Sequence, residues 1–361
     1  MCDGDFNTTS ERAFGHRFVK AKRALYLMKG KCKILGINNI DTNLRLFEAL
    51  VLSSLNFGCE LWGPAILNEQ EILGSHEVEK WHRLFLKRMI GVSKSAPTFC
   101  VMEELNGSPI DFYWLRLALG FWNIIILKDD DDSVYLAMTA TLEGELNWIR
   151  SILTTLSRFG SSVRICDVNP IDVDEVMLEV HEAWRNNLLK DHHNMRVRDI
   201  SDRERDGFKI IKYTKWFYPD PCRDIKLGYT NKLYRYDQIR IISQFRMGCH
   251  WLNCETLRKR LGVEIPRSQR ICEMCNFNQR EDEMHIFECP FYNDIRLKFQ
   301  GLFSGLLRDS YGDNNMTMWN FEFSDSEFKT LMNGDSTESF WVDLANFLLA
   351  CKKKRARALP S

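Results

Sequence analysis

The sequence lacks the features of membrane-spanning, secreted and nucleotide-hydrolysing proteins. No apolar run reaches the ~18 residues that a membrane span needs. The first residues, Met-Cys-Asp-Gly-Asp, are acidic and polar, whereas a secretory signal is basic and then apolar. A glycine-rich phosphate loop and a regular alternation of strands and helices are also missing, which argues against nucleotide hydrolysis. We therefore expect a protein of the nucleus or cytoplasm that is not secreted and has no membrane partner.

Net charge is missing too, because 49 Lys and Arg balance 49 Asp and Glu. An argument for an anionic partner must therefore rest on particular regions of the chain. The twelve cysteines form no framework of close pairs outside one short stretch. A reducing compartment is the natural location for such a chain, and the scattered cysteines are expected to be small core residues.

Apolar residues recur at helical spacing along most of the chain. The first such stripe is formed by Phe14, Phe18, Ala21, Leu25 and Met28. The same periodicity predicts further helices over residues 42–57, 75–91, 141–159, 172–190, 232–251, 291–307 and 339–351. A turn is expected at Trp62-Gly63-Pro64, after the helix predicted over residues 42–57.

The predicted fold is mainly α: a helical bundle, a helical connector, a small zinc-binding module and a C-terminal helix. We place the bundle at residues 1–165 and the connector, which carries a basic stretch, at 166–265. The zinc-binding module is placed at 266–300, and a C-terminal helical region with a basic tail at 301–361.

The most specific motif in the sequence is a set of four metal-binding residue types, Cys272, Cys275, His285 and Cys289. A Cys-x-x-Cys turn followed by a His/Cys pair supplies the four ligands of a tetrahedral Zn²⁺ site. His285 and Cys289 share one face of a helix, and Pro290 prevents that helix from continuing. The alternative is three buried free cysteines with an exposed histidine, and the polar residues between them argue against it. Four protein ligands leave no position for substrate, so the motif predicts a structural zinc ion and no activity.

A basic stretch precedes this motif. Residues 221–270 contain eleven Lys and Arg against four Asp and Glu, a net charge of +7. Such a regional excess is typical of phosphate binding by RNA or DNA. The candidate contacts are Arg240, Arg246, Arg258, Lys259, Arg260, Arg267 and Arg270. The alternative is a solvated face balanced by the acids at 281–283. Residues 352–357 add five cations in six positions, which suits a nuclear-import patch, a nucleic-acid contact or the end of a helix.

Cys249, His250 and Cys254 raise the question of a second metal site. They lie among large apolar residues, and free cysteines are usually buried, so core packing is the favoured interpretation.

Several short motifs occur in one order along the chain. They are Ala-Leu-Tyr-Leu-Met-Lys-Gly-Lys at 24–31, Leu-Phe-Glu-Ala-Leu-Val at 46–51, Asn-Phe-Gly-Cys-Glu-Leu-Trp-Gly at 56–63, Phe-Leu-Lys-Arg-Met-Ile-Gly-Val at 85–92, and Glu-Leu-Asn-Gly-Ser-Pro at 104–109. Phe245-Arg246 and His250-x-Leu252 then precede the cysteine motif. Together they resemble the region that follows the polymerase core in LINE-type (non-LTR) retrotransposon reverse transcriptases, over most of residues 10–300. Phe57 departs from the pattern, in which tyrosine is commoner, as does the Asn-Gly-Ser before Pro109.

The resemblance implies the post-palm part of such an enzyme, which grips template RNA or target DNA without chemistry of its own. Its partners would be the phosphate backbone of RNA or DNA and the catalytic part of a retroelement polymerase. The palm carboxylates that hold two metal ions are absent, because the first motif already lies beyond the palm. Asp129–Asp132 are the one superficial candidate, and a solvated loop between helices explains them better. A zinc-stapled structural or protein-interaction module without nucleic-acid binding is the alternative function.

Overall fold

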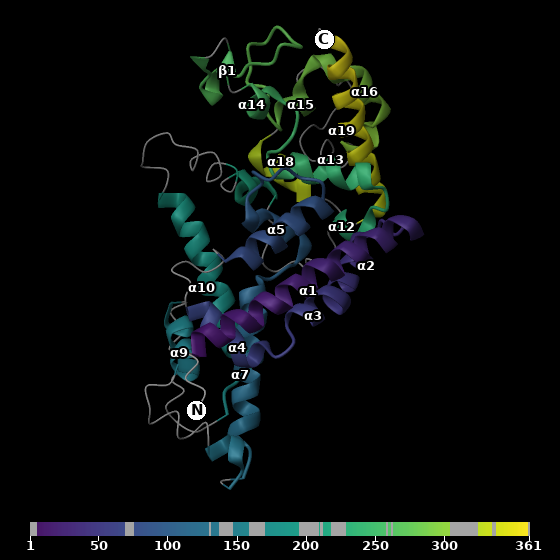
Figure 1. Ribbon diagram of the computed structural model, residues 1–361. Helices are drawn as coiled ribbons and strands as arrows, with labels where there is room; N and C mark the ends of the chain where they lie inside the picture. The colour runs from purple at the N-terminus through teal and green to yellow at the C-terminus, as the bar shows by residue number, and fades with distance from the viewer. Residues whose placement is uncertain are drawn as a thin grey trace. The chain divides into compact units, whose positions relative to one another are not determined.

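A computed structural model describes most of the chain as helices (Figure 1). The described residues are 6–68, 76–129, 131–136, 147–158, 170–194, 209, 212–217, 229–257, 259–260, 263–303, 324–333 and 337–359. They fall into two compact units: unit 1 comprises residues 1–85 and 107–191, and unit 2 comprises 86–106 and 192–361. Unit 2 therefore contains both the predicted zinc-binding module and a short segment from the N-terminal part of the chain. The prediction of a mainly α fold is confirmed.

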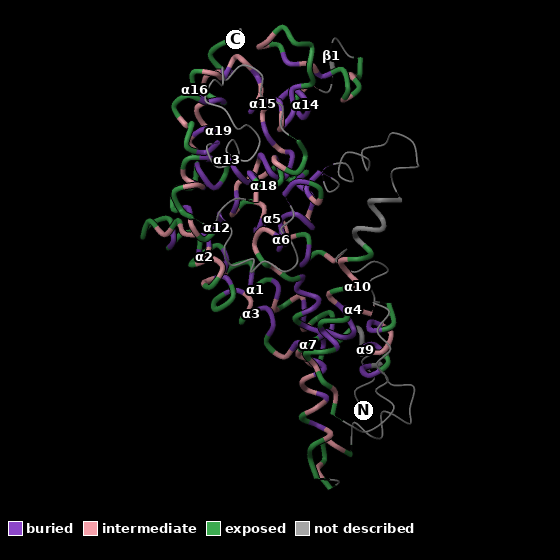
Figure 2. Tube along the Cα trace, turned by 180° about the vertical axis from the view of Figure 1, so that it is seen from behind, coloured by how far each residue is buried: buried purple, intermediate pink, exposed green. Residues whose placement is uncertain are grey.

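Unit 1 is built from helices alone in the part of it that the structure describes. They are α1 (Phe6–Leu35), α2 (Ile40–Leu46), the π-helical η1 (Phe47–Leu52), α3 (Ser53–Leu55), α4 (Cys59–Asn68), the first part of α5 (Glu77–Met89), α7 (Ile110–Ile126), α9 (Asn147–Arg158) and most of α10 (Val173–Asn194). The predicted stripe of α1 is buried along its whole length, and Figure 2 shows the buried residues in purple. Helix α4 packs against α1, α7 and α9.

The turn expected at Trp62-Gly63-Pro64 is wrong, because all three residues lie inside α4. A proline in a helix leaves the carbonyl four residues earlier without its usual donor. In this protein that carbonyl belongs to Glu60, and the indole N–H of Trp148 donates to it at 2.8 Å. The partner that makes the proline acceptable lies in α9, far along the sequence.

A buried carboxyl pair joins α5 to the start of α7. Glu79 is fully buried, and its Oε1 accepts the backbone N–H of Asp111 at 3.0 Å. Burial, followed by the nearby Asp111 carboxylate, raises the pKa of Glu79 to about 8. Burial lowers the pKa of the neighbouring His82 to about 3. Both side chains are therefore held neutral near pH 7.

In the part of unit 2 that the structure describes, helices of 3 to 21 residues accompany one pair of short strands. Its helices are α6 (Thr98–Leu105), η3 (Tyr213–Phe217), α12 (Tyr229–Lys232), α13 (Tyr236–Arg246), α14 (Asn253–Thr256), η5 (Arg267–Gln269), α15 (His285–Glu288), η6 (Pro290–Tyr292), α16 (Asn293–Lys298), η7 (Gln300–Leu302), α18 (Asp325–Asn333) and α19 (Glu338–Ala358). Strands β1 (Lys259–Arg260) and β2 (Val263–Glu264) pair antiparallel. Helix α13 packs against α19 in the core, and Phe287 of α15 stacks on Phe347 of α19 at 5.2 Å between ring centroids.

Two helix predictions for unit 2 differ from the structure. The single helix expected over 232–251 is divided into α12 and α13, and α13 ends before Gly248, whose φ of +58° requires the left-handed region. The C-terminal helix continues through residues 352–357, so the basic tail is the last part of α19. Among the described residues no single helix is long and apolar enough to cross a membrane, although the bent pair Ile40–Leu55 and Cys59–Asn68 passes that test together.

Candidate metal centre

The Cys-x-x-Cys segment forms the tip of a tight loop. Ile271 and Arg280 form an antiparallel bridge at its base, and the Cys272 N–H donates to the Gln279 carbonyl at 2.8 Å. Asn278 closes the loop with a φ of 53°, a conformation that asparagine tolerates better than most residues. The loop therefore holds both cysteines of the motif close to the segment that follows it.

His285 and Cys289 lie at the two ends of α15. The Asp282 carboxylate accepts the His285 N–H at 3.0 Å and so caps the helix at its start. The Cys289 N–H donates to the His285 carbonyl at 2.7 Å, and Pro290 begins the 3₁₀ turn η6. One turn of helix therefore places the imidazole and the last thiol on the same side.

The four side chains converge on one point, with their ligand atoms all within 4.8 Å of one another. Cys272 Sγ lies 3.9 Å from Cys289 Sγ, and Cys275 Sγ lies 3.4 Å from His285 Nε2. A tetrahedron with Zn–S bonds of about 2.3 Å and a Zn–N bond of about 2.0 Å has S–S edges of about 3.8 Å and S–N edges of about 3.5 Å. The arrangement thus fits a metal ion held by three sulfurs and one nitrogen, as the spacing predicts, and His285 is buried together with Cys272 and Cys289, whereas Cys275 is partly exposed.

The surroundings also suit a metal site. His285 Nδ1 lies 3.0 Å from Gln279 Oε1, an interaction that fixes the ring so that Nε2 faces the sulfurs. The Met274 N–H points at Cys272 Sγ at 3.4 Å. A hydrogen bond from the Cys289 thiol lowers the pKa of Cys272 to about 4 and raises the pKa of Cys289. One thiolate is therefore favoured even without the charge of an ion, and thiolate is the form that binds zinc.

A buried ion pair attaches this loop to α19. Arg355 donates to both carboxylate oxygens of Glu281 at 2.7 and 2.8 Å, and it donates to Asn253 Oδ1 at 2.8 Å. Glu281 also accepts the Asn253 N–H at 2.7 Å. We call these three residues the Glu281 clamp. From the other side Arg296 donates to the carbonyl of Cys289 at 2.9 Å. The candidate metal centre is thus joined to the core of unit 2.

The expectation that Arg246 contacts phosphate is wrong, because its side chain is buried. Its Nε donates to Glu104 Oε1 at 2.6 Å, and its other nitrogens donate to the carbonyls of Met332 and Phe217 at 2.6 and 2.5 Å. Four aromatic rings surround the guanidinium at 5.3 to 6.0 Å, those of Tyr213, Phe217, Tyr229 and Trp341. Arg246 holds the core of unit 2 together.

Two further predicted phosphate contacts are also used inside the protein. Arg270 is buried and donates to the Cys254 carbonyl at 2.6 Å. Arg267 pairs with the buried Glu255 at 2.6 Å. Arg258 lies outside the described residues, and only the backbone of Lys259 and Arg260 is described, in β1.

Arg240 is the one member of the predicted set with an exposed, described side chain, and α19 adds a second cation beside it. Burial, followed by the charge of Arg240, lowers the pKa of Lys352. The Lys352 ammonium lies 5.5 Å from the centre of the Trp251 ring. In the part of the chain that the structure describes, neither cation forms an ion pair. We call Arg240, Lys352 and Trp251 the Arg240 surface.

The Arg240 side chain lies over Gly91, which fixes where its stem runs. A Cβ on Gly91 would lie 2.7 Å from Arg240 Cγ, and Gly91 has a φ of +71°. Sequence reasoning found Arg240 but did not connect it with Lys352, because only the packing of α13 on α19 brings them together. The signal in the sequence was the run of cations in residues 352–357.

A second buried group, His250, Cys254, Glu255 and Glu283, also has metal-binding residue types close together. Its carboxylates are already neutralised. Lys212 contacts Glu283 directly and lies 3.9 Å from Glu255, and His250 Nε2 lies 2.8 Å from Glu283. The positive charges around Glu283 lower its pKa despite its complete burial. The Lys212 ammonium occupies the position that a metal ion would need, so we interpret this group as a buried network of charged side chains.

The acidic run at 129–132 follows the buried helix α7, as the sequence predicts. Asp132 pairs with Lys128 at 2.9 Å and accepts the Val134 N–H at 2.8 Å. The described residues of this run belong to a turn at the surface.

Comparisons of the chain with models of protein families, with curated proteins and with solved structures give no match.

Proposed function

We propose that this chain is a non-catalytic, nucleic-acid-binding region of a LINE-type reverse transcriptase, in which a structural zinc ion orders the binding surface. Cys272, Cys275, His285 and Cys289 would hold the ion, and the free energy of its binding would stabilise the fold. The phosphate backbone of RNA or DNA is the proposed ligand.

The observation that carries the proposal is the Arg240 surface. Two like charges side by side repel one another, and here that repulsion comes with partial burial of Lys352. A phosphate placed between them would relieve the repulsion and form charge-assisted hydrogen bonds. The adjacent Trp251 ring offers a face on which a base can stack.

The metal centre is coupled to the Arg240 surface through α19. Arg355, which completes the Glu281 clamp, lies three residues after Lys352, one turn further along the helix. Loss of the metal would loosen the loop that contains Glu281 and with it the last turns of α19. The proposal therefore predicts that nucleic-acid binding depends on the metal.

The test is a binding titration of the zinc-loaded full chain with labelled single-stranded RNA and with duplex DNA. Arg240→Gln with Lys352→Gln should weaken binding and, if both cations contact phosphates, lower the salt slope by about 1.8 for duplex DNA. The matched control is Lys298→Gln with Lys329→Gln, two exposed cations on α16 and α18. Equal affinity and equal salt slope in the two double variants contradict the proposal.

One observation favours the alternative of a zinc-stapled structural or protein-interaction module. Arg246, Arg267, Arg270 and Arg355 all use their charge on partners inside unit 2. If this internal use accounts for the basic stretch, the full chain binds no nucleic acid at low salt while it still binds the metal. The same titration, started at low ionic strength, distinguishes the two functions.

A further inference from the structure

Helix α1 is far more basic than the rest of unit 1. Over its 30 residues it has eight Lys and Arg and one acid, Glu11. Three of the cations are occupied: Lys22 pairs with Glu77 at 2.9 Å, Arg17 lies over the Phe57 ring at 4.1 Å, and Lys29 over that of Phe85 at 5.3 Å. The remaining five are Arg12, Lys20, Arg23, Lys31 and Lys33, which are exposed and have no ion pair among the described residues.

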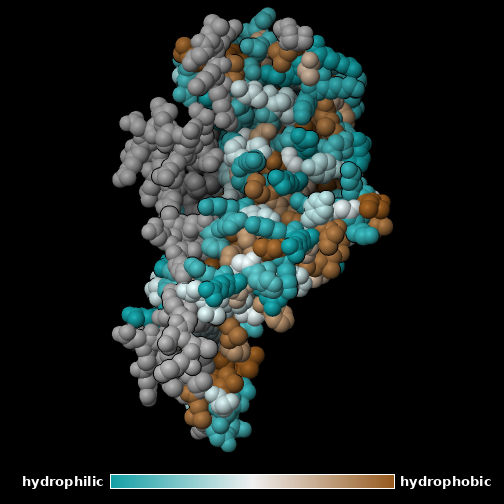
Figure 3. All heavy atoms as spheres, in the orientation of Figure 1, coloured by the Kyte–Doolittle hydropathy of each residue, from teal (hydrophilic) through white to brown (hydrophobic). Residues whose placement is uncertain are grey.

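Large apolar side chains lie between these cations on the face opposite the core. Val19 is 48% exposed, Leu27 65%, Ile34 78%, and the Tyr26 ring 80%. At 100° per residue they fall within a band on the side of the helix away from Phe18 and Leu25. Figure 3 shows apolar atoms among hydrophilic ones on the visible face along α1.

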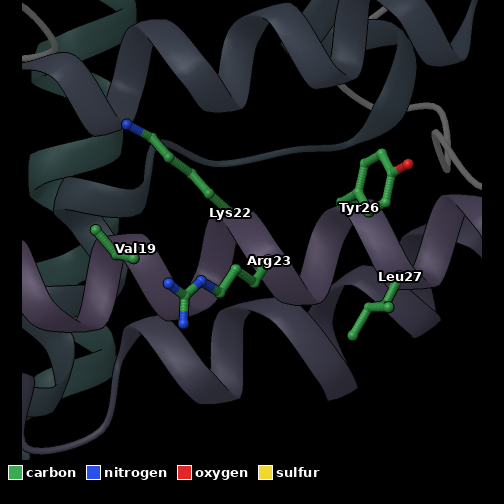
Figure 4. A pocket seen from close by; sticks show the side chains of 5 residues that line it. All are labelled: Val19, Lys22, Arg23, Tyr26 and Leu27. Carbon is green, nitrogen blue, oxygen red and sulfur yellow. The ribbon is translucent and has the colours of Figure 1, made fainter.

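A shallow groove of ≈ 490 Å³ lies in the first half of this band, lined by Val19, Lys22, Arg23, Tyr26 and Leu27. Lys22 and Tyr26 stand at one edge of α1 and Leu27 at the other, with Val19 and Arg23 between them (Figure 4). The strip is apolar along Val19, Tyr26 and Leu27, with Lys22 at its edge and Arg23 within it. Exposed apolar side chains interspersed with cations are a feature of protein interaction surfaces.

The charges decide which occupant this face suits. A second copy of α1 would bring eight more cations against the first eight, so self-association through this face is disfavoured. A nucleic-acid backbone would match the cations but leave Val19, Leu27 and Ile34 against phosphates. An amphipathic helix matches both features if its apolar strip is flanked by acids.

We infer that the exposed face of α1 is the docking site for an acidic amphipathic helix of a partner protein. From Val19 to Ile34 the strip extends about 22 Å at 1.5 Å per residue, so the partner helix needs about 15 residues in contact. Its apolar residues, three and four apart, lie on Val19, Tyr26, Leu27 and Ile34, and its carboxylates face Lys20, Arg23 and Lys31. This surface is separate from the Arg240 surface and does not rest on nucleic-acid binding.

The probe is a labelled synthetic helical peptide of about three heptads, with leucine at positions a and d and glutamate at e and g. Fluorescence anisotropy with the full chain should give saturable binding that weakens at least about tenfold for Lys20→Glu with Arg23→Glu. A second peptide with lysine in place of glutamate should bind this double variant better than it binds the unchanged chain. That rescue shows that the variant is folded and that charge pairing across the interface determines affinity. Leu27→Ser should weaken both peptides.

Two controls separate this inference from the proposed function. Lys298→Glu with Lys329→Glu makes the same change in net charge elsewhere and should leave peptide affinity unchanged. Arg240→Gln with Lys352→Gln should also leave peptide affinity unchanged, whether or not it weakens nucleic-acid binding. Absence of saturable peptide binding, or equal affinity before and after the reversal in α1, overturns the inference. Displacement of the peptide by phosphatidylserine vesicles or by a single-stranded oligonucleotide, at lower concentration than unlabelled peptide, overturns it as well.

Discussion

Breaking the Glu281 clamp should loosen residues 271–289, which we call the metal loop, without removing a candidate metal ligand. Arg355→Met keeps most of the side-chain volume but removes the donors to both Glu281 oxygens and to Asn253 Oδ1. The side chains of Arg355 and Glu281 are only 8% and 1% exposed, so the carboxylate left behind is buried, and among the described residues the Asn253 N–H is its remaining donor. Removing one partner of a buried ion pair costs about 3–5 kcal/mol.

Removing the charge of the other partner should recover much of that loss. Glu281→Gln in the Arg355→Met background replaces a buried carboxylate with a neutral amide that still accepts the Asn253 N–H. We expect the double variant to be less destabilised than the sum of the single variants, with a coupling of about 1–3 kcal/mol. Lys353→Met, an exposed neighbour on α19, is the control and should change stability by less than about 0.5 kcal/mol.

Hydrogen exchange is the suitable assay, because the chain has two units and a single unfolding free energy is not defined for it. The amides of residues 281–289 should lose protection in Arg355→Met and regain part of it in the double variant, while those of α1 stay unchanged. Release of zinc to a colorimetric chelator should be fastest from Arg355→Met, slower from the double variant and slowest from the unchanged chain. If Arg355→Met costs less than about 1 kcal/mol of local opening free energy, or if the two substitutions are additive, the clamp does not hold the metal loop.

Two further predictions concern unit 1. Because its pKa of about 8 lies above its ordinary value of 4.5, Glu79 keeps a proton that the unfolded chain has lost, so unit 1 loses stability as pH rises to about 8. His82, with its pKa of about 3, acts in the opposite direction up to pH 6.5, so the loss appears between pH 6.5 and 8, at most about 1.4 kcal/mol per pH unit. Glu79→Gln should flatten exchange-derived stability over this range, and an unchanged slope counts against a raised pKa of Glu79. Trp148→Phe leaves the Glu60 carbonyl without its donor and should cost about 1–3 kcal/mol in α4 exchange; an effect below about 0.5 kcal/mol contradicts this account of the proline.

Local features of the fold were predictable from the sequence because their causes are local. The four candidate metal ligands lie within 18 positions, and a turn, a helix of one turn and a proline suffice to bring them together. The stripe of α1 follows in the same way from helical spacing. Gly58 and Gly91 end helices with φ values of +73° and +71°.

The errors come from partners that lie far away in the sequence. Arg240 and Arg246 lie in the same helix, and the local sequence does not distinguish them. Arg246 pairs with Glu104, 142 residues earlier, whereas Arg240 pairs with no acid among the described residues. The local sequence predicts a turn at Pro64 because the donor that allows this proline to lie in a helix, the Trp148 indole, is 88 residues from the Glu60 carbonyl that it serves. In the basic tail, Arg355 forms a buried ion pair with Glu281, 74 residues earlier, and so does not contribute an exposed charge. A regional charge excess therefore cannot distinguish exposed cations from those that the fold uses internally.

The most direct test of the account is a measurement of metal binding by the purified full chain. Elemental analysis after exhaustive dialysis should find about one zinc ion per chain, and replacement by cobalt should give the intense visible absorption of a tetrahedral site with thiolate ligands. Cys289→Ser should lower the stoichiometry and expose residues 271–289 to hydrogen exchange, whereas Cys32→Ser, at a buried cysteine of α1, should leave both unchanged. A chain that retains no zinc, or that retains it equally after Cys289→Ser, contradicts a metal centre at Cys272, Cys275, His285 and Cys289.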